Sequence, residues 1–134
     1  MNETIYALLR LGDGAAEQID RLSRQLERIA QYAFGNTRRQ IGAMFRVLEE
    51  KRMLEKALYY RENLLKGLTD EEVKLLFYRA YGVPSERING EMGYSSRSVR
   101  RKTNDAVRAA ENILYLLGCD GAVAKECEKV CSFA

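Results

Sequence analysis

The chain has 134 residues and a net charge of +3, with 46% hydrophobic and 31% charged residues. This balance is typical of a soluble, helix-rich chain that forms one compact domain, or a small domain with a helical arm. Histidine is absent, which excludes imidazole bases, Ser-His triads and histidine-ligated metal sites. No segment approaches the roughly 18 apolar residues of a membrane span, and the N-terminal segment lacks the features of a secretory signal. We therefore expect a cytoplasmic protein that does not contact a membrane.

The three cysteines lie near the C-terminus, at Cys119, Cys127 and Cys131. An odd number of cysteines in a cytoplasmic protein indicates free thiols. The spacing has no CxxC pair and the region offers no fourth ligand, so we expect small buried apolar residues, no metal site and no cofactor. Gly118 is expected to end a helix, and residues 122–131 are predicted to form a last short helix.

The first part of the chain is predicted to be helical. Residues 2–11 form a short apolar segment of one or two helical turns, which Gly12, Asp13 and Gly14 interrupt. Asp13 is a suitable cap for the helix that follows. The apolar residues of that helix alternate spacings of four and three, the pattern of a coiled-coil seam. They are Ala15, Ile19, Leu22, Leu26, Ile29 and Ala33.

A long helix over about residues 38–66 follows. Gly35 and Asn36 end the preceding helix, and Thr37 with Gln40 is predicted to form a capping box. The short break favours an antiparallel hairpin of the two helices, with one bent continuous arm as the alternative. A two-helix hairpin has too little core to stand alone, so it must pack on a second copy or on the rest of the chain. The first of these predicts a homodimer through the N-terminal helices.

Local chemistry predicts three helices between residues 68 and 118. Thr69 and Glu72 form a capping box at the start of the first helix. Its apolar residues recur on one helical face, namely Val73, Leu76, Phe77, Ala80 and Tyr81. A glycine and Pro84 end this helix, and Ser85 is predicted to cap the second one.

A tight turn is predicted between the second and third helices. The second helix is short and buries two apolar residues, Ile88 and Met92. Gly93 supplies the positive φ of the turn, Tyr94 follows as a plug of the core, and Ser95 or Ser96 caps the third helix. The inner face of the third helix is apolar and consists of Val99, Ala106, Val107, Ala110, Ile113, Leu114 and Leu117. The three segments therefore have the pattern of a trihelical helix-turn-helix unit.

The outer face of the third helix is basic. Between Ser85 and Arg108 there are six basic residues and three acidic ones, a plausible footprint for phosphate. A helix-turn-helix places its second helix in the major groove, where residues near the N-terminus of that helix reach base edges. The residues at this position are Ser95, Ser96, Arg97, Arg100, Arg101 and Asn104.

Each of these residue types has a known way of binding DNA. Arginine grips guanine with two hydrogen bonds and asparagine does the same for adenine, so we predict that Arg97 and either Arg100 or Arg101 reach bases. Ser95, Ser96 and the amides of the helix N-terminus are expected to bind a phosphate. Two further basic side chains are expected to neutralise phosphates of the DNA backbone, namely Arg87 and Lys102. The alternative is a solvated surface with a helix ion pair, such as Arg101 with Asp105.

Residues 85–107 resemble the helix-turn-helix of sigma factor region 4, and are closer still to phage and mobile-element regulators of the ArpU/RinA kind. The residues that carry the resemblance are Ile88, Met92, Gly93, Tyr94, Ser95, Ser98, Val99, Asn104, Ala106 and Val107. Residues 69–81 resemble the helix that precedes the motif in those families. The resemblance implies transcriptional control of a phage or integrated element, through promoter DNA and contact with RNA polymerase.

Two other classes of function remain open. A small terminase-like subunit also joins a helix-turn-helix to an oligomerisation segment, although it usually places the DNA-binding unit first. A helical protein-interaction module that never touches DNA is the other. An enzyme would need an activated nucleophile or a cluster of carboxylates, and the sequence provides neither pattern, so we expect no catalysis. The predicted fold is all-α, with a helical hairpin over residues 1–67, a helix-turn-helix domain over 68–118 and a short helical tail over 119–134.

Overall fold

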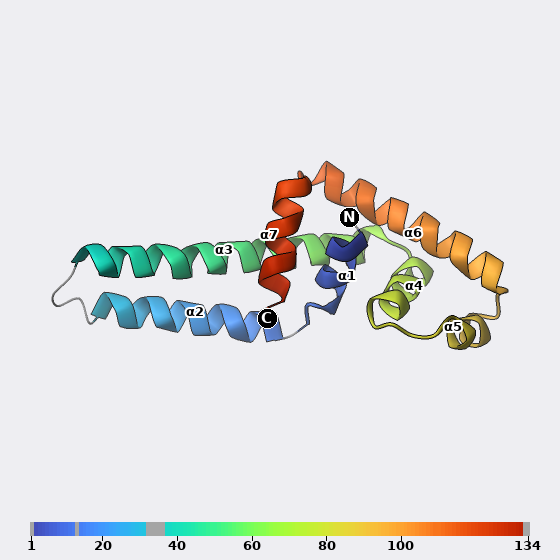
Figure 1. Cartoon of the computed structure of the whole chain (residues 1–134), viewed down its shortest axis with the longest axis horizontal. Helices are drawn as coiled ribbons and strands as arrows, with labels where there is room; N and C mark the ends of the chain where they lie inside the picture. The colour runs from blue at the N-terminus through green and yellow to red at the C-terminus, as the bar shows by residue number, and fades with distance from the viewer. Residues whose placement is uncertain (1, 13, 32–36, 133–134) are drawn as a thin grey trace.

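The computed structural model describes residues 2–12, 14–31 and 37–132. Seven α-helices and no strand occur in these ranges, which confirms the all-α fold (Figure 1). The helices are α1 Asn2–Arg10, α2 Gly14–Gln31, α3 Thr37–Gly67, α4 Asp70–Ala80, α5 Ser85–Met92, α6 Ser96–Leu116 and α7 Gly121–Cys131. No helix within the described ranges is long and apolar enough to cross a membrane. The predicted roles of Asp13, Ala33, Gly35 and Asn36 fall outside the described residues.

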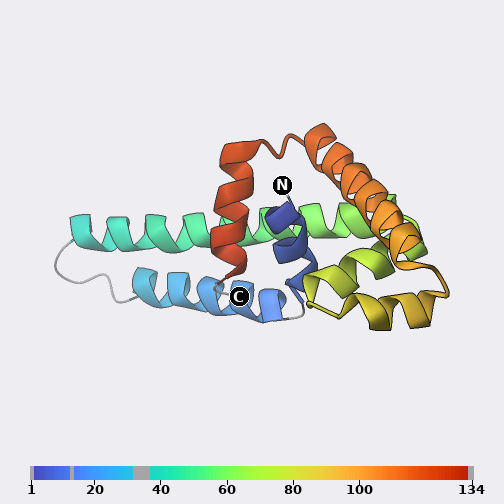
Figure 2. The same cartoon turned by 45° about the vertical axis from the view of Figure 1, so that its right-hand side comes forward.

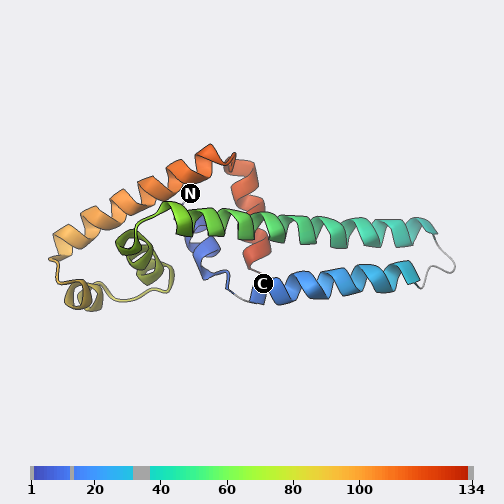
Figure 3. The ribbon, with the colours of Figure 1, turned by 180° about the vertical axis from the view of Figure 1, so that it is seen from behind.

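Helices α2 and α3 lie side by side and run antiparallel, seen from both sides in Figure 1 and Figure 3. The bent continuous arm is therefore not the arrangement found. The predicted seam of α2 faces α3, because Ala15 and Leu22 are buried and Ile19, Leu26 and Ile29 are partly buried against the core. Gln40 donates its side-chain amide to the carbonyl of Ile29, so it links α3 to α2 across the hairpin.

The N-terminal helix α1 lies at the centre of the molecule. Its buried side chains are Thr4, Ile5, Leu8 and Leu9, and it contacts α3, α4, α6 and α7. The exposed residues of α1 are Asn2, Glu3 and Arg10 at its two ends, whereas Tyr6 and Ala7 are partly buried. One continuous core therefore joins α1 and α3 to α4, α6 and α7, and this core crosses the predicted boundary at residue 67.

The C-terminal helix α7 crosses α3 near the base of the hairpin and packs on α1 (Figure 2). Asp120 caps α7 by accepting a hydrogen bond from the amide of Val123. Glu128 accepts a hydrogen bond from the hydroxyl of Thr4, which ties the last helix to the first. The cysteines are free thiols, as expected, with Cys119 and Cys127 buried and Cys131 half-buried.

Candidate nucleic-acid interface

Helices α4 and α5 begin in different ways. The predicted capping box of α4 is present: Thr69 accepts a hydrogen bond from the amide of Glu72, whose carboxylate accepts one from the amide of Thr69. The predicted cap of α5 is wrong, because the helix already includes Ser85 and its N-cap is Pro84, which makes no side-chain hydrogen bond. The fixed φ of Pro84 orders this helix start instead.

The turn between α5 and α6 has the predicted geometry. Gly93 ends α5 with a φ of 72°, in the left-handed region that glycine reaches without strain. Ser95 is the N-cap of α6, and its hydroxyl accepts a hydrogen bond from the amide of Ser98 at 3.2 Å. Asn89 of α5 donates its amide to the hydroxyl of Ser96. The start of α6 is therefore fixed to α5 by both backbone and side chains.

A small apolar cluster holds α4, α5 and α6 together. Leu75, Ile88 and Val99 are each 1% exposed, and Tyr78, Val83 and Met92 pack around them. The predicted apolar face of α4 did not include Leu75. This helix in fact buries two faces, since Leu76 and Ala80 enter the main core while Leu75 turns towards α5 and α6.

Two aromatic residues predicted to lie in the core are exposed. The side chain of Tyr81 is 62% exposed and its ring stacks on that of Phe77, with the centroids 6.2 Å apart. Tyr94 is 36% exposed, and the Lys102 ammonium lies 4.5 Å from the centroid of its ring. Tyr94 therefore anchors a cation above the turn and does not fill the core beneath it.

The predicted basic face of α6 is exposed along its length. Residues from four successive turns line one shallow hollow on this helix, namely Arg97, Ser98, Arg100, Arg101, Asn104, Asp105 and Arg108. Across the described residues, none of its four arginines lies within ion-pair distance of a carboxylate, so the alternative pair of Arg101 with Asp105 is not formed. Four unpaired cations beside a single carboxylate make a surface of positive potential.

Arg108 belongs to this surface but was not among the predicted DNA-binding residues. It follows Arg101 by seven positions and Asn104 by four, which are the spacings of one helical face. That periodicity would have found it.

The other two predicted cations have partners within the chain. Lys102 lies 3.5 Å from a carboxylate oxygen of Glu71, so it joins α6 to α4. Arg87 lies 3.4 Å from Glu91 on the same helix, and the other oxygen of Glu91 accepts a hydrogen bond from Tyr78. The hydrogen bond from Tyr78, then Arg87, holds the pKa of the Glu91 carboxyl below its usual value. Both cations are therefore already partly neutralised.

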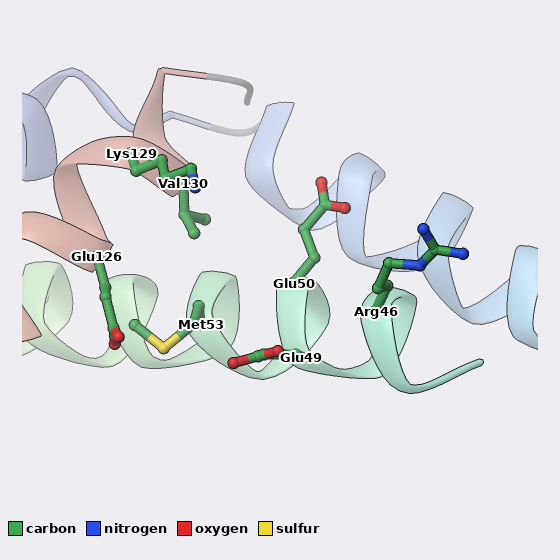
Figure 4. Close-up of a pocket in the computed structure, with 7 residues that line it drawn as sticks. All are labelled: Arg46, Glu49, Glu50, Met53, Glu126, Lys129 and Val130. Atoms are coloured by element: carbon green, nitrogen blue, oxygen red, sulfur yellow. The ribbon is translucent and has the colours of Figure 1, made fainter. Parts of the chain in front are cut away.

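A second hollow lies between α3 and α7 (Figure 4). Its lining mixes three carboxylates with two cations and two apolar side chains: Arg46, Glu49, Glu50, Met53, Glu126, Lys129 and Val130. No cluster of potential metal ligands occurs in the described part of the chain. Burial raises the pKa of Cys127 to about 12 and that of Cys131 to about 11, so both thiols stay protonated at neutral pH and are weak nucleophiles.

Comparison with known proteins finds no matching family model, no matching curated sequence and no matching solved structure. The resemblance to sigma factor region 4 therefore depends on the residues of α4, α5, the turn and α6 alone. The strongest structural feature of this region is the unpaired arginine surface of α6.

Proposed function

We propose that this chain is a sequence-specific DNA-binding transcriptional regulator whose helix α6 enters the major groove of double-stranded DNA. The observation that carries the proposal is the exposed row of unpaired arginines on α6, directly after a glycine turn and a serine cap. The assignment to a phage or integrated element, acting at promoters with contact to RNA polymerase, follows the resemblance alone.

The shape of α6 suits a major groove. The helix has 21 residues, which corresponds to a length of about 31 Å at 1.5 Å per residue. Its first three turns carry Arg97, Arg100, Arg101 and Asn104 on the exposed side, while Val99, Thr103 and Ala106 are buried on the other. The major groove of B-DNA is about 12 Å wide and admits a helix of this kind.

Each residue of the surface has a distinct role in the proposal. Arg97 and Arg101, or Arg100 in its place, reach guanine edges, and Asn104 reaches adenine one turn further along. The amides at the start of α6 bind a phosphate, and Arg108 contacts the backbone. The hydroxyls of Ser95 and Ser96 already accept hydrogen bonds within the protein, so they position the helix. Lys102 and Arg87 contribute long-range charge to the same face.

The test is binding to a fluorescent random-sequence duplex across a salt titration, with wild type beside an Arg100→Ala/Arg101→Ala variant. Neutralising each phosphate contact contributes about 0.9 to the slope of log affinity against log salt. We expect the slope to fall by about 1 for each of the two arginines that contacts a phosphate, with a loss of affinity of at least about tenfold at low salt. The matched control is Arg24→Ala/Arg28→Ala, which removes the same charge from the exposed surface of α2.

Unchanged affinity in the Arg100→Ala/Arg101→Ala variant would remove α6 from the interface. An equal loss in the α2 control would show that only net charge matters. A selection from random duplexes then tests base recognition: Asn104→Ala should relax the preference at one adenine position by about 1–3 kcal/mol and leave the other positions unchanged.

A further inference from the structure

The outer part of the hairpin, consisting of α2 and residues 37–48 of α3, leaves large apolar side chains uncovered. Within residues 37–48 only Val47 is buried. Ile41, Phe45 and Leu48 are 48%, 66% and 41% exposed, and they recur at spacings of four and three on one face of α3. With Leu26 of α2 and Met44, they line a hollow whose exposed lining is apolar throughout. Apolar residues gathered this way mark an interaction surface.

Leu26 is the α2 residue that lines this hollow, and the helical face beside it carries small residues. Ser23 and Ala30 lie three positions before and four positions after Leu26, so they share its helical face. Ala16 continues the same face one heptad earlier, and Ala16 and Ala30 are exposed. The exposed surface is therefore bulky along α3 and low along the face of α2 beside Leu26; these are the bulky wall and the small wall. Bulky and small residues on facing helices interdigitate when two such walls meet.

The charges beside the two walls have opposite signs. Asp20 and Glu27 lie beside Ser23 and Leu26 on α2, whereas Arg38 and Arg52 lie one turn before Ile41 and one turn after Leu48 on α3. All four side chains are exposed. None of them makes an ion pair within the described residues. Asp20 and Glu27 of α2, and Arg38 and Arg52 of α3, are therefore free to pair with opposite charges of another chain.

We propose that this surface binds a second copy of the chain, so that two hairpins form a four-helix bundle in which α2 of each copy packs against α3 of the other. Leu26 lines the same hollow as Ile41, Met44 and Phe45, so these residues lie at one level along the hairpin. Rotation about a two-fold axis parallel to the hairpin does not shift residues along the helices, so the same residues of the second copy lie at the same level. The axis therefore places the small wall of α2 against the bulky wall of the partner's α3. By symmetry, the same contact forms between α3 and the partner's α2.

The same arrangement pairs two of the unpartnered charges. Gln40 bonds to Ile29, and Leu26 lies beside Ile41 and Phe45, so Asp20 lies within a turn of the partner's Arg52 along the bundle, a distance that an arginine side chain spans. Burying Phe45, Ile41 and Leu48 supplies the apolar core that a lone hairpin lacks. Where α6 binds DNA as proposed above, this axis also places both α6 helices at the same end of the dimer. The association itself does not depend on DNA binding.

Sedimentation velocity over a wide range of protein concentrations, without DNA, tests the proposal. We expect the wild type to be a dimer that dissociates on dilution. Asp20→Arg and Arg52→Glu each replace two attractive contacts by repulsive ones, so each should weaken the dimer by about tenfold or more. The double variant Asp20→Arg/Arg52→Glu restores opposite charges, so its dissociation constant should return to within a few-fold of the wild-type value.

The control for surface charge is Arg46→Glu, which makes the same charge change on α3 but lies in the hollow facing α7. It should leave the dimer unchanged. Phe45→Ser should abolish association while circular dichroism shows unchanged helix content, because the Phe45 side chain is exposed in the single chain. A wild type that stays monomeric, a ring of many subunits, or a dimer unaffected by Phe45→Ser would each overturn the proposal. DNA binding by a monomer would overturn the proposed dimer but would leave the proposed function intact.

Discussion

The base of the molecule and the outer part of the hairpin use the same kind of amphipathic helix with opposite results. In the base, α1, α4, α6, α7 and the second half of α3 cover one another, and Leu8, Leu64 and Leu114 are fully buried. In the outer part, two helices have only each other, and Phe45 is 66% exposed. An apolar stripe therefore shows that a helix has a face to cover, but not that its own chain covers it.

The comparison is tested most strongly by truncating one leucine in each region. Leu8→Ala removes a fully buried side chain and should cost about 2–5 kcal/mol in the free energy of unfolding. Leu48→Ala removes a side chain that is 41% exposed and should cost less than about 1 kcal/mol in the monomer. Urea denaturation at low protein concentration measures both. Equal losses would mean that the two regions are packed alike.

At higher protein concentration, the effect of Leu48→Ala should grow if the hairpin dimerises, because association stabilises the folded chain by mass action. The effect of Leu8→Ala should not depend on concentration. The difference between the two variants thus distinguishes a surface covered by a second copy from one that stays open.

The packed base of the molecule should also become less stable at alkaline pH, because burial raises the pKa values of several side chains in this region. In the folded chain the pKa of Cys127 rises from 9.0 to about 12, that of Cys131 from 9.0 to about 11, and that of Tyr60 from 10.0 to about 12. Between the ordinary and the raised values, the unfolded chain binds fewer protons than the folded one. The free energy of unfolding therefore falls as pH rises through this window, by up to about 1.4 kcal/mol per pH unit for each group.

Urea denaturation at a series of pH values from 8 upwards checks this pH dependence. Cys127→Ala should make the fall of the unfolding free energy with pH less steep, because it removes one of the groups whose pKa is raised. A curve that stays level between pH 9 and pH 11 would show that these groups titrate at their ordinary values in the folded chain.

A smaller effect is expected at the two helix starts. Thr69→Ala removes half of the capping box of α4 and should cost about 1 kcal/mol in the free energy of unfolding. Ser85→Ala should change it by only a few tenths of a kcal/mol, because Ser85 lies inside α5 and makes no cap. Thermal denaturation of the two variants compares them directly. A larger loss of stability in Ser85→Ala than in Thr69→Ala would mean that Ser85 caps α5, as the sequence predicted.

The smallest expected effect is the difference in stability between alanine substitutions at two glycines of α3. A Cβ at Gly42 meets nothing within 4 Å, so Gly42→Ala should stabilise the hairpin by about 0.5–1 kcal/mol. A Cβ at Gly67 lies 2.7 Å from Cδ1 of Ile113, and that methyl group must move to make room. Gly67→Ala should therefore gain less than Gly42→Ala, or destabilise the base. Guanidinium denaturation of both variants measures the difference.

Local chemistry was sufficient to predict much of the fold and of the candidate site. The capping box of Thr69, the left-handed Gly93 and the cap at Ser95 depend only on neighbouring residues, and all three are present. The exposure of Arg97, Arg100, Arg101 and Asn104 follows from helical periodicity with Val99 and Ala106 on the inner face. Such features need no knowledge of distant segments.

Several failures have a different cause, because they depend on contacts between helices. The exposed ring of Tyr94 lies under the ammonium of Lys102, and Lys102 forms an ion pair with Glu71 of α4. Leu75 is buried because α5 and α6 cover it, which the single apolar stripe of α4 does not indicate. The central place of α1 could not be read from its own residues, since its partners lie in four other helices.

The contact between Thr4 and Glu128 spans 124 positions of the chain. During synthesis, α1 leaves the ribosome well before α7, one of the helices that cover it. Part of its buried face, which includes Ile5, Leu8 and Leu9, stays uncovered until α7 emerges. Closing such a long loop slows folding and leaves apolar surface open to aggregation in the meantime. The hairpin of α2 and α3, in contrast, has partners close in sequence and can form while the rest of the chain is still being translated.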